Sequence, residues 1–288
     1  MTQRQADLLL LTATAVWGAS FVVVKEALAA ASPLTFVAVR FAVAALVLTP
    51  FTDLRTPFSR RELGAGLLLT GLLASGFATQ AVGLVHTTPA RSAFIVALSS
   101  VLAPAVAFFA LRQRQSVAVI AALLVAGIGV YFLTAPETAG LSRGDAWTLI
   151  TAVVFGAQIV AVAELSRRYD PRRLVWLQMA GTAVLIGAAA PLLETPMLRW
   201  SPGFAAALLY AAVIATALAF IWQMQAQRHM SSARAALIFC FEPVFAAAAS
   251  WLWLGETLAA SQWIGGGLIL AGMVLADAPL SSRQGASR

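Results

Sequence analysis

The chain has 288 residues, of which 60% are hydrophobic and only 11% are charged. So few charges cannot cover a soluble surface, which excludes a soluble enzyme or binding domain and favours a chain that lies in lipid. The formal net charge is +7, but the basic residues are spread among the ends of the apolar segments, so a nucleic-acid partner is not expected.

Apolar segments follow one another from the N-terminus to the C-terminus, each of about 20 residues, the length that a helix needs to cross a bilayer. They are continuously apolar and do not alternate in polarity, which favours helices over strands. We predict an all-α integral membrane protein with ten transmembrane helices, at about residues 8–30, 34–52, 63–84, 91–111, 116–134, 145–163, 173–193, 203–226, 233–253 and 261–278.

Basic residues are distributed unequally between the two ends of these segments. If the N-terminus is cytoplasmic, most arginines lie at the cytoplasmic ends, and the other side holds only Lys25, Arg91, Arg143 and Arg199. This asymmetry follows the positive-inside rule, so we expect both termini to be cytoplasmic.

The same order of features occurs twice along the chain. A shift of 138 residues carries Trp17, Glu26 and Pro33 onto Phe155, Glu164 and Pro171, and a shift of 143 carries Gln80 and Gly129 onto Gln223 and Gly272. We therefore predict two five-helix repeats, at 1–135 and 145–288, joined by a loop at 136–144; the second includes a cytoplasmic C-terminal tail. Because five is odd, the two repeats should be inverted, an arrangement typical of alternating access.

Several short motifs carry a family resemblance that extends over nearly the whole chain. They are Trp17-Gly18-Ala19-Ser20-Phe21, Val39-Arg40-Phe41-Ala42, Glu242-Pro243-Val244 and Trp253-Leu254-Gly255-Glu256. With this order and spacing, the chain resembles the EamA-type drug/metabolite transporters, and among them the amino-acid exporters, including YddG-like proteins associated with aromatic amino acids. The resemblance implies a ten-helix exporter of metabolites in a bacterial inner membrane.

Two charged side chains lie deep inside predicted helices, where a charge is costly unless it is paired or hydrated. Arg40 could reach back to the outer interface, or it could face a cavity and hold a substrate carboxylate. Glu242, which precedes Pro243, could bind a substrate ammonium, carry a coupling proton or hold two helices together by a hydrogen bond. The repeat places Ser99 where the second half has Glu242.

Uncharged polar and aromatic side chains complete the predicted cavity. Deep amides should face protein or cavity, as interhelical hydrogen bonds or as substrate contacts, because lipid offers them no partner. Trp17 and Phe21 lie one helical turn apart and could form an apolar wall. The predicted cavity residues are Trp17, Phe21, Arg40, Gln80, Ser99, Gln158, Trp176, Gln178 and Gln223, with Glu242 as a candidate coupling residue.

We therefore predict a carrier for a small solute, most simply an amino acid, with no catalytic residue, metal or cofactor. The alternatives are a carrier of another solute class, such as a lipophilic cation, a nucleotide sugar or a sugar phosphate, and a membrane-embedded enzyme. The glycine-rich helix at 261–278 could serve close packing within one chain or assembly of a homo-oligomer.

Overall fold

The computed structural model describes residues 1–87, 89–134, 142–254 and 260–284. Within them the regular structure is helical, apart from one isolated bridge between Ala31 and Leu198. Most of the predicted loop at 136–144, and Gly255 and Glu256 of the motif above, lie outside the described residues.

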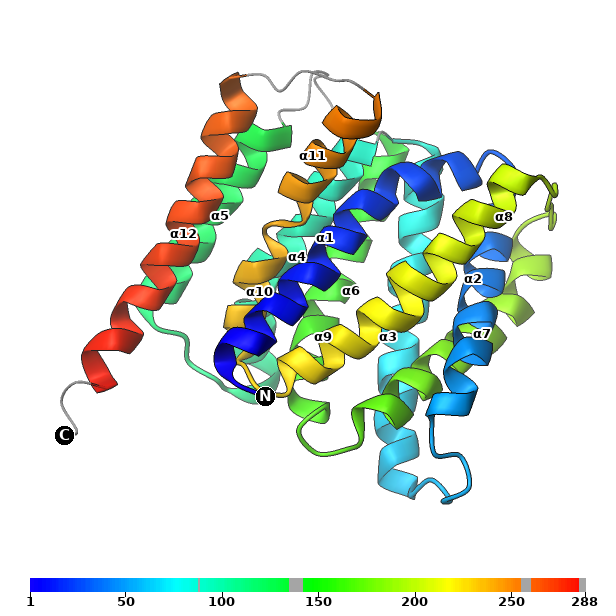
Figure 1. The fold of residues 1–288 in the computed structure, drawn as a ribbon, viewed down its shortest axis with the longest axis horizontal. Coiled ribbons are helices and arrows are strands. Elements are labelled where there is room, and N and C mark those ends of the chain that lie inside the picture. The colour runs from blue at the N-terminus through cyan, green and yellow to red at the C-terminus, as the bar shows by residue number, and fades with distance from the viewer. Residues whose placement is uncertain (88, 135–141, 255–259, 285–288) are drawn as a thin grey trace.

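The first half forms five helices joined by short links (Figure 1). They are α1 (Gln3–Ala27), α2 (Pro33–Leu48) with the 3₁₀ turn η1 (Thr49–Phe51), α3 (Arg60–Val85), α4 (Pro89–Leu111) and α5 (Val117–Thr134). The second half repeats this order, with its third and fourth members divided into pieces. It comprises α6 (Arg143–Leu165), α7 (Pro171–Leu193), α8–η2–α9 (Pro202–Leu209, Tyr210–Leu218, Ala219–Gln227), α10 and α11 (Ser232–Phe239, Glu242–Leu254) and α12 (Ala260–Gln284).

Seven of these units are long and apolar enough to cross a membrane, counted over the described residues. The other three, α4, α5 and α12, contain the shorter apolar stretches Ile95–Leu111, Val117–Gly129 and Trp263–Gly272. The predicted fold class, an all-helical membrane protein of ten helices in two halves, is confirmed. The first helix begins five residues earlier than predicted, because the Thr2 side chain and Gln5 form a capping box at its start.

Two irregularities fall in the second half, within the eighth and ninth predicted spans. The segment η2 is a π-helix of nine residues in which the Thr216 hydroxyl donates to the Ala211 carbonyl, five residues back. The ninth span is broken by a turn at Cys240 and Phe241. Pro243 has no N–H to continue the helix, so Glu242 becomes the first residue of a new helix inside the membrane.

The two halves run in opposite directions. At the C-terminal end of α1, Lys25 Nζ donates to the Thr87 carbonyl at 3.0 Å. The Thr87 hydroxyl in turn donates to Asp145 Oδ1 at 2.9 Å, in the first turn of α6. The end of α1 and the start of α6 therefore lie at the same face, which confirms the inverted arrangement of the halves.

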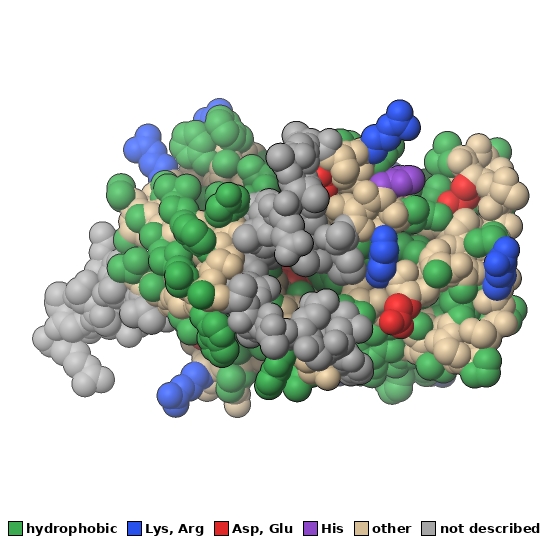
Figure 2. Space-filling model, turned by 90° about the horizontal axis from the view of Figure 1, so that it is seen from above, with side chains coloured by type: hydrophobic (Ala, Val, Ile, Leu, Met, Phe, Trp, Pro, Cys, Tyr) green, Lys and Arg blue, Asp and Glu red, His purple; other side chains and the backbone are tan. Residues whose placement is uncertain are grey.

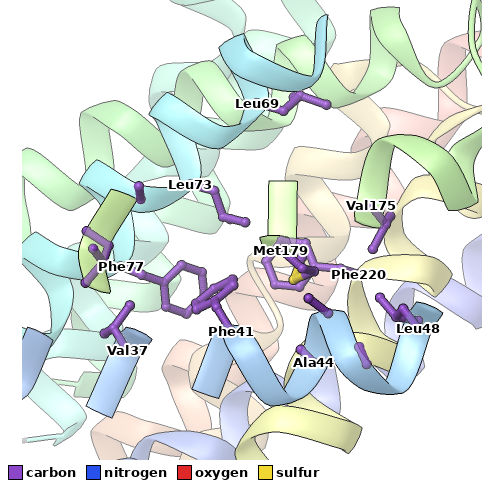
Figure 3. Close-up of a cluster of buried hydrophobic side chains, with 14 of the residues drawn as sticks. Val37, Phe41, Ala44, Leu48, Leu69, Leu73, Phe77, Val175, Met179 and Phe220 are labelled. Atoms are coloured by element: carbon purple, nitrogen blue, oxygen red, sulfur yellow. The ribbon is translucent and has the colours of Figure 1, made fainter. Parts of the chain in front are cut away.

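The largest hydrophobic cluster joins helices from both halves. Figure 3 shows Phe41 of α2 and Phe77 of α3 side by side, with Met179 of α7 next to Phe220 of α9. The Phe41 and Phe77 ring centroids are 4.9 Å apart and their planes meet at 74°, an edge-to-face contact. This cluster fixes α3 and α9 relative to each other.

Helices α5 and α12 lie side by side at one edge of the molecule (Figure 1). A Cβ on Gly129 would come within 2.7 Å of the Gly265 carbonyl, and one on Gly272 within 2.7 Å of the Ala122 carbonyl. These two repeat-related glycines therefore permit close packing within one chain. Assembly through 261–278 stays a prediction.

Charged side chains are scattered among hydrophobic and other side chains over the face opposite the N-terminus (Figure 2). The arginine-rich links gather at the other end: Arg234 pairs with Asp7 near the N-terminus at 2.8 Å, and Arg167 donates to the Met230 carbonyl.

Candidate functional site

A central cavity lies between the two halves, with an empty volume of about 590 Å³, solvent at its mouth included. Helices α1, α3, α4, α6, α9, α10 and α11 all contribute to it. Its described lining consists of Trp17, Leu73, Phe77, Gln80, Val96, Ser99, Phe155, Gln158, Ile159, Phe220, Gln223, Phe239 and Glu242.

Most of this lining consists of residues that the duplication relates to each other. The shifts of 138 and 143 residues found in the sequence connect ten of the lining residues in five pairs. The pairs are Trp17 with Phe155, Phe77 with Phe220, Gln80 with Gln223, Val96 with Phe239, and Ser99 with Glu242. The pseudo-symmetry of the two halves therefore centres on this cavity.

Six of the predicted site residues meet here: Trp17, Gln80, Ser99, Gln158, Gln223 and Glu242. Trp17 is held by a 2.7 Å hydrogen bond from its Nε1 to the Ala215 carbonyl in η2. Its ring meets Phe220 at 5.2 Å and Phe239 at 5.9 Å between centroids. The result is an aromatic wall with contributions from α1, α9 and α10.

Amide groups in and behind the wall are incompletely satisfied. Gln158 Nε2 donates to Gln178 Oε1 at 3.0 Å, which leaves Gln158 Oε1 and Gln178 Nε2 without partners in the described structure. Gln223 Oε1 is likewise buried and unpartnered there. Since buried polar groups are normally hydrogen-bonded, the two amides that line the cavity, Gln158 and Gln223, each keep an unused acceptor next to it.

Glu242 is partly buried in the cavity wall, at the start of α11. Within the described part of the chain no side chain donates a hydrogen bond or a salt bridge to its carboxylate. The sequence allowed three roles for Glu242, one of them a hydrogen bond that holds two helices together. Among the described residues no side chain makes such a bond to Glu242. The coupling role stays a prediction.

Arg40 and Phe21 lie beside the central cavity and not in its lining. Together with Phe77 and Gln80 they border a smaller hollow of about 330 Å³. Phe77 and Gln80 line both spaces, so α3 forms the partition between them.

The Arg40 guanidinium is almost fully buried, with 3% of the residue exposed. Its Nε donates to the Thr216 hydroxyl at 2.6 Å, and its Cζ lies 4.9 Å from the Phe77 ring centroid. No carboxylate pairs with it within the described residues. Arg40 thus lies inside the protein, near η2, and does not extend to the membrane surface.

Two further predicted site residues, Trp176 and Gln178, also lie outside the cavity lining. Trp176 donates from Nε1 to the Thr49 hydroxyl at 3.1 Å and stacks on Phe58, beside the link between α2 and α3. Gln178 lies behind Gln158, as its hydrogen-bond partner. Trp176 is therefore a packing residue in this conformation, and Gln178 supports a cavity residue.

Sequence reasoning missed several apolar lining residues, chiefly Phe77, Phe220, Val96 and Phe239. A signal for the first two was present, because each lies one helical turn before one of the paired glutamines, Gln80 and Gln223, on the same helix face.

Comparison with known proteins gives consistent matches over nearly the whole chain. The sequence profile of the EamA-like transporter family matches residues 4–135 and 142–276, once in each half. An uncharacterized transporter of Archaeoglobus fulgidus is 32% identical over 273 residues, covering 94% of this chain and 85% of that protein. The uncharacterized inner membrane transporter YicL of Salmonella typhimurium is 27% identical over 288 residues, covering 94% of this chain and 95% of its own length.

A solved crystal structure shares the fold, with a TM-score of 0.79 over 94% of this chain and 97% of the other. The identity between the two sequences is 18%, so this likeness concerns the fold alone.

Proposed function

Because this chain belongs to the EamA-like transporter family, we propose that it exports small amphipathic metabolites, amino acids including aromatic ones among them, by alternating access through the central cavity. The chain is a multi-pass membrane transporter and not an enzyme. The substrate class, the direction of transport and the mechanism are the parts proposed here.

One observation supports the proposal above the others: a central cavity lined by five repeat-related pairs from two inverted halves. In such an arrangement the halves can exchange conformations, so that one end of the cavity closes as the other opens. The lining combines five aromatic rings with amides and one carboxylate, which suits a solute with an apolar body and a polar head.

Alternative substrates can be compared against the same lining. A nucleotide sugar or sugar phosphate would need cationic side chains facing the cavity, and no described lining residue is basic. A lipophilic cation is the second candidate, because Glu242 is the one ionisable side chain among the described lining residues.

We place the protein in a bacterial inner membrane with both termini in the cytoplasm. The contacts of Arg234 and Arg167 place arginine-rich links at the same end of the molecule as the N-terminus. This distribution supports the orientation through the positive-inside rule. The relative YicL, described as an inner membrane transporter, supports the location.

Counterflow of labelled aromatic amino acids in proteoliposomes tests the proposed function. We expect exchange by the parent protein and its loss, by at least tenfold, in Val96→Phe. Val96 is buried and lines the cavity, so a larger ring there occupies space that the solute needs.

Val184→Phe is the matched control, because it makes the same change on α7 at a side chain that is 73% exposed. Absence of exchange by the parent protein for every amino acid tested would refute the proposal. Equal exchange by Val96→Phe and Val184→Phe would show that the solute does not pass through this cavity.

A further inference from the structure

We infer that the central cavity selects its solute by a protonated amine, which Glu242 and neighbouring amide oxygens bind, and that a carboxylate on the solute is not required. This inference rests on the proposed function, since it names the chemical group by which the same cavity recognises its substrate. It separates amines and amino acids, which should bind, from organic acids, which should not.

The described lining contains acidic but no basic side chains. Glu242 is its one ionisable residue, and the remaining lining residues are aromatic, aliphatic, amide or hydroxyl side chains. Arg40, the nearby cation, borders the smaller hollow beyond Phe77, where its Nε donates to the Thr216 hydroxyl. A solute carboxylate entering the cavity would therefore meet an acidic side chain and no basic one in the described lining, whereas an ammonium would meet its counter-ion.

Hydrogen-bonding capacity points the same way. An ammonium carries three donors, and it needs acceptors when it leaves water. Among the described lining residues, the Glu242 carboxylate accepts no hydrogen bond from a side chain, and the Gln158 and Gln223 amides each have a buried, unpartnered oxygen that can accept one once the amide turns toward the solute. Glu242 also begins α11, where the positive end of the helix stabilises a negative carboxylate.

The aromatic lining adds a third contribution. Trp17, Phe77 and Phe220 present ring surfaces to the cavity. The faces of such rings attract cations, and the attraction grows when water is excluded. The same rings accommodate the apolar body of an aromatic solute, so one cavity can bind both parts of an aromatic amine.

Three compounds with the same phenyl group test the inference: phenethylamine, which has only an amine; L-phenylalanine, which has both groups; and 3-phenylpropionate, which has only a carboxylate. Binding is measured by ligand-induced thermal stabilisation of the purified full-length protein in detergent, and exchange by counterflow in proteoliposomes. We expect phenethylamine and L-phenylalanine to bind and 3-phenylpropionate to bind at least tenfold more weakly.

Variants of Glu242 identify the recognising group. Glu242→Gln should weaken binding of both amines at least tenfold, and Glu242→Asp, which keeps the charge, should retain the preference for amines. Glu26→Gln is the matched control, because Glu26 is an exposed carboxylate at the end of α1 and should bind as the parent does.

The outcomes separate the two proposals. Equal binding of 3-phenylpropionate and phenethylamine, or amine binding that is unchanged in Glu242→Gln, would overturn the inference whatever the exchange results. Amine binding that depends on Glu242 without any exchange would uphold the inference and refute the proposed function. Binding of none of the three compounds would overturn both.

Discussion

Gly18→Ala is expected to push α1 away from α11, at a cost of about 1–3 kcal/mol in the free energy of unfolding, and to abolish transport. A Cβ at Gly18 would lie 2.5 Å from the Glu242 carbonyl oxygen and 2.9 Å from the Ala246 nitrogen. Both are backbone atoms that cannot rotate away, so one helix must shift. Because that shift moves the start of α11, it moves Glu242 in the cavity wall.

The repeat provides a matched comparison for this variant. Gly156 is related to Gly18 by the shift of 138, and it packs against Ser99, the counterpart of Glu242. A Cβ at Gly156 would lie 3.1 Å from the Ser99 carbonyl oxygen, so a displacement of a few tenths of an ångström relieves the contact. We expect the thermal stability in detergent to fall clearly in Gly18→Ala and less in Gly156→Ala. Equal stability of Gly18→Ala and the parent would contradict the close packing of α1 on α11.

Arg173→Gln should lower the free energy of unfolding by about 2–3 kcal/mol, because it leaves the Glu62 carboxylate buried without its cation. Arg173 Nε donates to Glu62 Oε1 at 2.7 Å, and Nη1 donates to the Thr56 carbonyl at 3.0 Å. The guanidinium also lies 4.0 Å from the Phe58 ring centroid. This residue thus ties the start of α7 to α3 and to the link between α2 and α3.

An exposed arginine in the link between α6 and α7 serves as the control. Arg168 lies 3.5 Å from Glu164 with 68% of its side chain exposed, so Arg168→Gln should cost no more than about 0.5 kcal/mol. Glu62→Gln combined with Arg173→Gln should recover part of the loss, since no buried charge is then left unpaired. Thermal unfolding in detergent provides all three comparisons, and a loss in Arg168→Gln as large as that in Arg173→Gln would contradict this account.

The arrangement of the helices could be predicted from the sequence because lipid imposes it. Each span must be apolar over about 20 residues, so the spans can be located in the sequence. The matching positions of Gln80 and Gln223 in the two halves then indicated the duplication. Because each repeat has an odd number of helices, the second repeat must begin on the other side of the membrane, and so the two repeats are inverted. The same shifts found the pairs of Trp17 with Phe155 and Ser99 with Glu242, and each of these four residues lines the cavity.

The neighbours of a particular side chain could not be predicted in the same way. The depth of Arg40 in its helix indicated burial, but its placement beside Thr216 depends on the π-helix η2, for which the apolar run from Tyr210 to Leu218 gives no distinguishing signal. Trp176 was predicted to line the cavity, yet the face of α7 that it occupies turns toward Phe58 and Thr49. Such facing depends on helix rotation, which a uniformly apolar sequence does not encode.

The central claim is that one cavity opens alternately to each side of the membrane, and two-sided cysteine labelling tests it most directly. Cys240 is the only cysteine in the sequence and is buried, so Cys240→Ala provides a background into which Ser99→Cys places one thiol at the cavity wall. Arg55→Cys and Arg199→Cys, in exposed links at opposite ends, calibrate access from each side. We expect a membrane-impermeant maleimide to label Ser99→Cys from both sides, and each calibration site from one side only. Labelling of Ser99→Cys from a single side, with and without an exchangeable solute, would contradict alternating access through this cavity.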